Sequence, residues 1–149
     1  MSKKIEAILE LSRKADTDQD WEKIDDNIKK LAEENPNEAG KFILQFTSDP
    51  DSRVRDTTAT ILEFLDLSDN VLSEATKKMI TQATTDSDIF ASGRAATFLL
   101  RHSQNLSLKS EIEEALDEFL EWSTTNNWQE ELISNIPNES LHQLLIKSK

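Results

Sequence analysis

Apolar residues recur at helical spacing along almost the whole chain of 149 residues. Ile24, Ile28 and Leu31, for example, follow the i, i+4, i+7 pattern of one helix face. Short polar stretches separate these runs, and the chain contains only two glycines and three prolines. So few turn residues argue against a β-sandwich, a barrel or a glycine-rich nucleotide-binding fold. The pattern therefore predicts an all-α protein with about eight or nine helices.

The polar stretches place the ends of these helices. Asn35 precedes Pro36 and ends the second helix, because a residue before proline avoids the α-helical conformation. Asp51 follows Pro50 and is typical of a residue that caps a helix start. The expected helices cover about residues 3–15, 21–32, 37–46, 51–65, 70–84, 87–102, 107–122 and 126–135, with a short helix after Pro137. The short connections predict antiparallel helix pairs.

Two of these helical hairpins are related by an offset of 37 residues. Asp49 and Asp51 recur as Asp86 and Asp88. The same offset aligns Ala59-Thr60-Ile61-Leu62 with Ala96-Thr97-Phe98-Leu99, and then Val71, Ala75, Met79 and Ala83 with Leu108, Ile112, Leu116 and Leu120. We therefore expect one domain over 1–149, with a cap and a divergent repeat in 1–48, repeats at 49–85 and 86–122, and a C-terminal cap at 123–149.

The turn that opens the first of these repeats resembles the HEAT-repeat signature, in which Asp-Pro precedes Val-Arg and then a small residue. The matching residues are Asp49, Pro50, Val54, Arg55 and Ala59. The resemblance implies a right-handed α-solenoid of antiparallel helix pairs, a fold that mostly serves as a binding scaffold. It also implies that the arginine ties neighbouring repeats to the carboxylates of the turns.

The second copy of the signature is less complete. It keeps Asp86 but has Ser87 in place of proline and Ser92 in place of arginine. Arg94 lies close enough in the sequence to take over the role of the missing arginine. The resemblance therefore assigns Asp49, Arg55, Asp86 and Arg94 to contacts between repeats.

Charge narrows the possible partners. The chain carries 17 basic and 29 acidic residues, a net charge of −12. This balance argues against binding to duplex nucleic acid or to anionic membranes. It favours a basic partner, or serves only to keep the protein soluble and monomeric. The excess is sharpest in 105–131, where Lys109 is opposed by Glu111, Glu113, Glu114, Asp117, Glu118, Glu121, Glu130 and Glu131.

These charges predict a partner-binding surface on the helix at 107–122. If Ile112, Leu116 and Leu120 face the core, then Glu113, Glu114, Asp117, Glu118 and Glu121 point outward, flanked by Trp122 and Trp128. Tryptophan beside carboxylates is a common composition at interfaces. The alternative is that both tryptophans close the C-terminal end of the solenoid. By the same reasoning, we expect the preceding helix to present these residues outward: Glu74, Lys77, Lys78, Thr81 and Gln82.

No motif for catalysis, a cofactor or a metal is evident. The chain has no cysteine, and Asp16 to Asp20 resembles a calcium loop but lacks its later glycine and glutamate, which makes Asp18 or Asp20 a helix cap instead. His102 and His142 have no second ligand at suitable spacing, and the cation of His102 would suit the end of its helix. The N-terminus lacks a signal-type core, which favours a cytoplasmic location.

The sequence thus predicts a non-catalytic protein-interaction module that binds a basic protein and is monomeric when free. One alternative is a bacterial immunity-type protein that inhibits a basic toxin nuclease. The other is a small enzyme or a nucleic-acid-modifying HEAT-like protein, which the lack of a basic groove disfavours.

Overall fold

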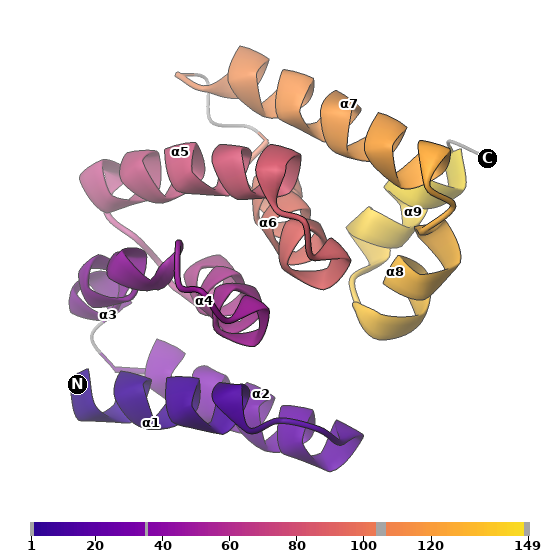
Figure 1. Cartoon of the computed structure of the whole chain (residues 1–149). Helices are drawn as coiled ribbons and strands as arrows, with labels where there is room; N and C mark the ends of the chain where they lie inside the picture. The colour runs from indigo at the N-terminus through magenta and orange to yellow at the C-terminus, as the bar shows by residue number, and fades with distance from the viewer. Residues whose placement is uncertain (1, 35, 104–106, 148–149) are drawn as a thin grey trace. The chain divides into compact units, whose positions relative to one another are not determined.

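The computed structural model describes residues 2–34, 36–103 and 107–147. All regular structure in these residues is helical (Figure 1), as the sequence predicted. The elements are α1 (Ser2–Arg13), α2 (Asp18–Ala32), α3 (Pro36–Ile43), the 3-10 helix η1 (Leu44–Phe46), α4 (Ser52–Phe64), α5 (Asp69–Thr85), α6 (Ile89–Arg101), α7 (Lys109–Thr125), α8 (Gln129–Asn135) and α9 (Glu139–Lys147). The predicted bounds differ from these by only a few residues.

The chain divides into two compact units, with the boundary inside α5. Unit 1 covers residues 1–75 and unit 2 covers residues 76–149. In unit 1, α1 and α2 lie side by side (Figure 1), and α1 also packs against α4. In unit 2, α6 packs against α7, α8 and α9.

The core of unit 1 follows the predicted helix stripes. Ile5, Ile8 and Leu9 of α1 are buried, as are Ile24 and Ile28 of α2. Apolar side chains at this spacing form one face of each helix, and packing shields that face from water. Their burial stabilises the unit by about 1.5–3 kcal/mol for each large side chain.

A buried pair of hydroxyl groups joins α1 to α4 within this core. The Oγ atom of Ser12 lies 2.6 Å from Oγ1 of Thr57. Ser12 donates its own hydrogen to the carbonyl oxygen of Ile8 at 3.0 Å. Thr57 is therefore the donor in the pair, and both hydroxyl groups are satisfied.

The turns before α4 and α6 have the same local structure. Asp51 and Asp88 are the N-caps, with φ and ψ of −84° and 118° in the first and −87° and 122° in the second. Asp49 and Asp86 each accept a hydrogen bond from the backbone N–H of the cap two residues later, at 2.9 Å in both cases. Both helices have 13 residues. The two segments that the 37-residue offset aligns in the sequence therefore share the capped turn and the helix length.

Side chains tie α5 to α6 within unit 2. Nε2 of Gln82 donates to the carbonyl oxygen of Ala91 at 2.8 Å, and Oγ of Ser92 donates to that of Ala83 at 2.8 Å. Gln82 is 5% exposed. The prediction that Gln82 points outward is therefore wrong, because a carbonyl oxygen on the next helix accepts a hydrogen bond from its amide nitrogen in the interior.

Both glycines of the chain lie inside helices where a neighbouring side chain comes close to the backbone. A Cβ atom on Gly40 in α3 would lie 2.5 Å from Cδ2 of Leu67. A Cβ atom on Gly93 in α6 would lie 2.6 Å from Cδ1 of Ile136 and 2.9 Å from Cδ2 of Leu132. Leu67 is only partly buried, whereas Ile136 and Leu132 are fully buried.

We therefore expect Gly93→Ala to destabilise the protein by about 1–3 kcal/mol, as overpacking of a filled core does. Gly40→Ala is the comparison variant. Its closest contact, Leu67, is only partly buried, while Cγ1 of the buried Val71 lies 3.2 Å away, so we expect a smaller loss that the better helix propensity of alanine partly offsets. Urea unfolding of the two variants measures the difference. Equal stability of both variants would show that α8 and the chain after it do not pack tightly on Gly93.

Candidate protein-binding surface

α7 separates a buried stripe from an exposed acidic face. Ile112, Ala115, Leu116, Phe119 and Ser123 are buried. Leu120, which the sequence placed in this stripe, is only partly buried, and Phe119 takes the fully buried position beside it. The five carboxylates that were predicted to face outward are all exposed: Glu113, Glu114, Asp117, Glu118 and Glu121.

Four glutamates form a row along one face of α7. Glu111, Glu114, Glu118 and Glu121 are spaced by three, four and three residues, and the row is about 15 Å long at the helical rise of 1.5 Å. None of them forms an ion pair within the described residues. We call these four residues the acidic row. Glu111 was not among the predicted binding residues, although its spacing from Glu114 and Glu118 already places it on this face.

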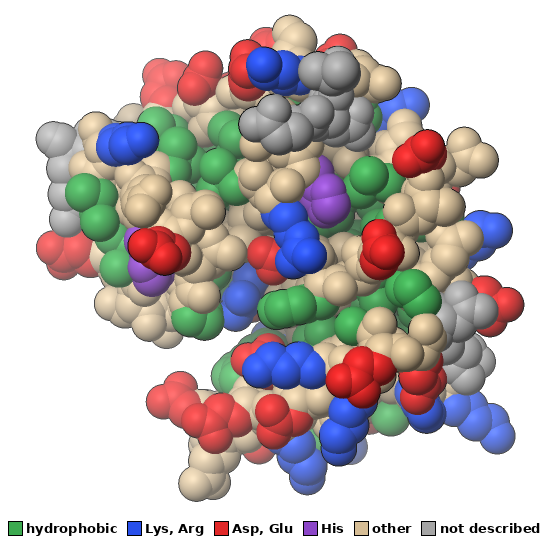
Figure 2. Space-filling view, turned by 180° about the vertical axis from the view of Figure 1, so that it is seen from behind, with side chains coloured by type: hydrophobic (Ala, Val, Ile, Leu, Met, Phe, Trp, Pro, Cys, Tyr) green, Lys and Arg blue, Asp and Glu red, His purple; other side chains and the backbone are tan. Residues whose placement is uncertain are grey.

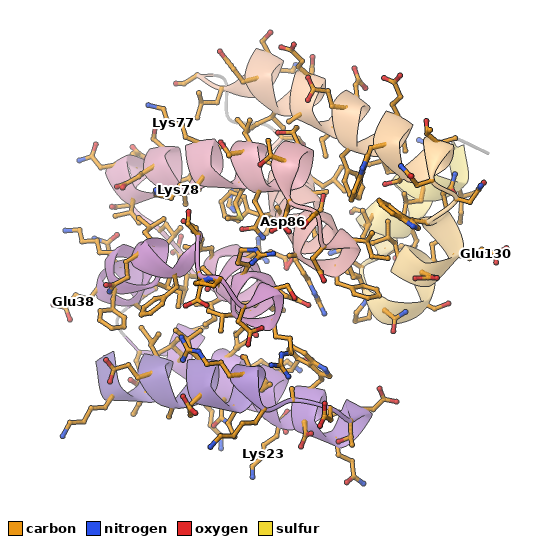
Figure 3. The ribbon with its side chains drawn as sticks, viewed as in Figure 1. Lys23, Glu38, Lys77, Lys78, Asp86 and Glu130 are labelled. Atoms are coloured by element: carbon orange, nitrogen blue, oxygen red, sulfur yellow. The ribbon has the colours of Figure 1, made fainter. Side chains whose placement is uncertain are left out.

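The space-filling view agrees with this distribution of charge. In Figure 2, acidic side chains gather over α7 along the upper edge of the view, whereas over α1 and α2 they are mixed with basic ones. Beyond the end of α7, Glu130 in the first turn of α8 points away from the helices of unit 2 (Figure 3).

The acidic row ends beside a pair of tryptophans. The ring centroids of Trp122 and Trp128 are 4.2 Å apart and their planes meet at 75°, an edge-to-face contact. Phe119 lies behind them, with its centroid 6.4 Å from that of Trp122. Both tryptophans are partly exposed. Trp122 and Glu118 are one helical turn apart, so the aromatic pair and the acidic row share one side of α7.

The helix cap explains why the two tryptophans meet. Asn127 has φ of 58°, in the left-handed region that asparagine tolerates. Its N–H donates to the carbonyl oxygen of Thr124 at 3.2 Å, and the N–H of Trp128 donates to that of Ser123 at 3.0 Å. These two bonds form a Schellman motif, which brings the residue after the cap back against the last turn. The sequence signal was Asn126-Asn127, and we did not predict the motif from it.

The four residues assigned to contacts between repeats lie in or near the two capped turns. Nη1 of Arg55 donates to the carbonyl oxygens of Asp49 and Pro50 at 2.9 and 3.1 Å, within its own turn. Arg13 of α1 also reaches this turn, and its Nη2 donates to Oδ2 of Asp49 at 3.1 Å. Asp86 holds the equivalent turn in unit 2, and Arg94 is partly buried on α6.

The acidic segment before α2 is a capping box. Thr17 is the N-cap and accepts from the N–H of Asp20 at 3.2 Å, and Asp20 accepts from the N–H groups of Asp16 and Thr17. These bonds to Asp16 and Thr17 lower the pKa of Asp20. The cap is therefore Thr17 and not Asp18 or Asp20, because its hydroxyl group reaches the third residue of the helix.

The two histidines have different surroundings in unit 2. Nε2 of His142 lies 2.6 Å from the carbonyl oxygen of Ile136. The ring of His102 packs on Phe98, with centroids 4.5 Å apart, and its buried Nε2 has no hydrogen-bond partner in the described residues. Burial, together with the charge of Arg101, lowers the pKa of His102. The expected benefit of a His102 cation at the helix end is thus outweighed by its desolvation.

We expect His102 to make the protein less stable in mild acid. The unfolded chain takes up a proton near the ordinary pKa of 6.5, whereas folded His102 resists it, so stability falls as the pH drops below that value. Melting temperatures at pH 7.5 and 5.5 test this, since few carboxylates titrate in that range. The wild type should lose more stability than His102→Gln. Equal losses would contradict the assignment.

Within the described residues, no group of three His, Cys, Asp or Glu side chains is arranged to hold a metal ion. None of the described helices has both the length and the apolar character needed to cross a membrane. Comparison of the chain with protein-family models, curated proteins and solved structures finds no significant match.

Proposed function

We propose that the protein is a non-catalytic binding module whose α7 surface docks a basic protein partner. The observation that carries this proposal is the acidic row, four exposed carboxylates on one helix face without an ion-pair partner in the described residues. A cationic partner would relieve their mutual repulsion and be steered by their field.

The tryptophan pair supports the same surface as an interface. Aromatic side chains that are partly exposed supply large contact area at low cost in side-chain entropy, and tryptophan is enriched among residues that dominate binding energy. Because Trp122 and Trp128 pack against each other, their side chains lose little conformational entropy on binding. In this proposal the acidic row steers the partner and the tryptophans anchor it.

The proposed architecture is a right-handed HEAT-like α-solenoid. Its support is local: the capped turns at Asp51 and Asp88, the equal lengths of α4 and α6, and the sequence signature from Asp49 to Ala59. In such a fold α5 and α7 would be second helices of adjacent repeats, and the acidic row would line the concave face.

A synthetic helical peptide tests the binding proposal. The probe carries lysines at positions i, i+3, i+7 and i+10 on an alanine background, to match the spacing of the acidic row. We expect Glu114→Lys/Glu118→Lys/Glu121→Lys to weaken its binding at least tenfold by fluorescence anisotropy. The control Glu6→Lys/Glu22→Lys/Asp26→Lys changes the net charge equally, on exposed residues of α1 and α2. Equal weakening in both variants would refute a specific site on α7.

A further inference from the structure

The tryptophan pair at the end of α7 leaves aromatic surface open in unit 2. Within the described residues, neither indole has a lysine or arginine over its face, and their ring contacts are those with each other and with Phe119. Trp122 and Trp128 are both partly exposed. A cation supplied by a partner therefore finds an indole face that no cation of the described chain occupies.

A carboxylate lies one helical turn before Trp122. Glu118 is four residues earlier on α7, and side chains at this spacing are about 5–6 Å apart at their Cβ atoms. Glu118 is exposed and forms no ion pair in the part of the chain that the structure describes. A negative charge and an open aromatic ring therefore lie next to each other on one side of the helix.

This combination favours arginine over lysine as the cation of the partner. A guanidinium group is planar and weakly hydrated, so it stacks on an indole face while its N–H groups donate to a carboxylate beside the ring. A lysine ammonium is compact and strongly hydrated, and it gains less from the ring. Glu111 and Glu114 have no aromatic side chain one turn away on α7, so they discriminate less between the two cations.

We propose that an arginine side chain of the basic partner stacks on Trp122 and donates two hydrogen bonds to the carboxylate of Glu118. This inference rests on the proposed function, because it names the side chain that the α7 surface selects. Trp128 packs edge-to-face with Trp122, at 75°, and so restricts that ring before the guanidinium arrives.

Three synthetic peptides of equal charge test the proposal. They share the alanine background and the four cationic positions of the probe peptide, and carry lysine, arginine or Nε-trimethyl-lysine there. We expect the arginine peptide to bind the wild type about three to five times more tightly than the lysine peptide, the gain of an exposed cation–π contact. Trimethyl-lysine keeps the charge and the attraction to the ring but has no N–H donor for Glu118, so it should bind less tightly than arginine.

Single substitutions on α7 locate the selective site. Trp122→Leu should make the arginine and lysine peptides bind equally, with helical circular dichroism retained. Glu118→Gln, on an exposed residue, should also lower the preference for arginine, and it does so without removing an aromatic contact. The matched control Glu113→Gln removes the same charge from the same helix. Glu113 is exposed and lies nine residues from Trp122, about two and a half turns and thus on the opposite side of α7, so this variant should keep the preference.

The outcomes separate this inference from the proposed function. The choice of arginine is overturned by equal binding of the arginine and lysine peptides to the wild type, by a preference that survives Glu118→Gln, or by trimethyl-lysine binding as tightly as arginine. Each of these results leaves a basic partner on α7 in place. Failure of all three peptides to bind would refute both proposals.

Discussion

Lysine at Glu114, Glu118 and Glu121 is expected to slow the association of the basic probe peptide by about tenfold or more at low salt, with a smaller change in its dissociation rate. These carboxylates are exposed and lie along one face of α7, so they act on an approaching cation before contact is made. Electrostatic steering weakens as added salt screens it, with a Debye length of about 10 Å at 0.1 M. Stopped-flow measurements over a salt series give both rates.

The control variant for this experiment changes the net charge by the same amount, but on α1 and α2 instead of α7. Three Glu→Lys or Asp→Lys exchanges at Glu6, Glu22 and Asp26 reduce the net charge of −12 by the same amount. If steering is local to the acidic row, this control keeps most of the wild-type association rate. An association rate that does not depend on salt, or that falls equally in both variants, would mean that α7 does not guide the partner.

Val54→Asp is expected to unfold unit 1. Val54 is the third residue of α4 and is 0% exposed. A carboxylate there has no partner, and an uncompensated buried charge costs about 3–5 kcal/mol, a large part of the total stability of a domain. The variant should show loss of helical circular dichroism or a melting temperature lowered by many degrees.

Ser52→Asp is the matched control for this variant. Ser52 is the first residue of α4 and is partly exposed, and an acidic residue in the first turn interacts favourably with the helix dipole. It should melt at or near the wild-type temperature. A cooperative wild-type melt for Val54→Asp would contradict the placement of α4 in the core.

Much of the local fold was predictable because its causes lie close together in the sequence. The spacing of Ile24, Ile28 and Leu31 predicts α2, because the spacing of apolar residues alone defines the buried face of a helix. The start of α4 followed from Asp51, because an aspartate at the N-cap acts on N–H groups only two or three residues away. Asp88, its equivalent after 37 residues, caps α6 at Ile89, two residues after the predicted start at 87.

The features that sequence reasoning missed depend on contacts between helices. Gln82 is buried because the carbonyl oxygen of Ala91 lies on the facing helix, and nothing in its own helix indicates this. The lowered pKa of His102 comes from the burial of its ring at the end of α6, which the spacing of residues along that helix does not show.

For the acidic surface, the exposed residues were predictable and their arrangement was not. The carboxylates face outward because the opposite face of α7 is apolar, and this follows from periodicity. The edge-to-face contact of Trp122 and Trp128 requires the left-handed conformation at Asn127. Asparagine only permits that conformation, so the sequence indicated a helix end but not the return of Trp128 onto α7.

Amide chemical-shift mapping with the basic probe peptide tests most directly whether α7 is the docking surface. With the labelled full chain, the account predicts the largest shifts at Glu111, Glu114, Glu118 and Glu121 and at the indole N–H groups of Trp122 and Trp128. Shifts spread evenly over the exposed carboxylates of α2, or the absence of shifts at both indoles, would contradict it.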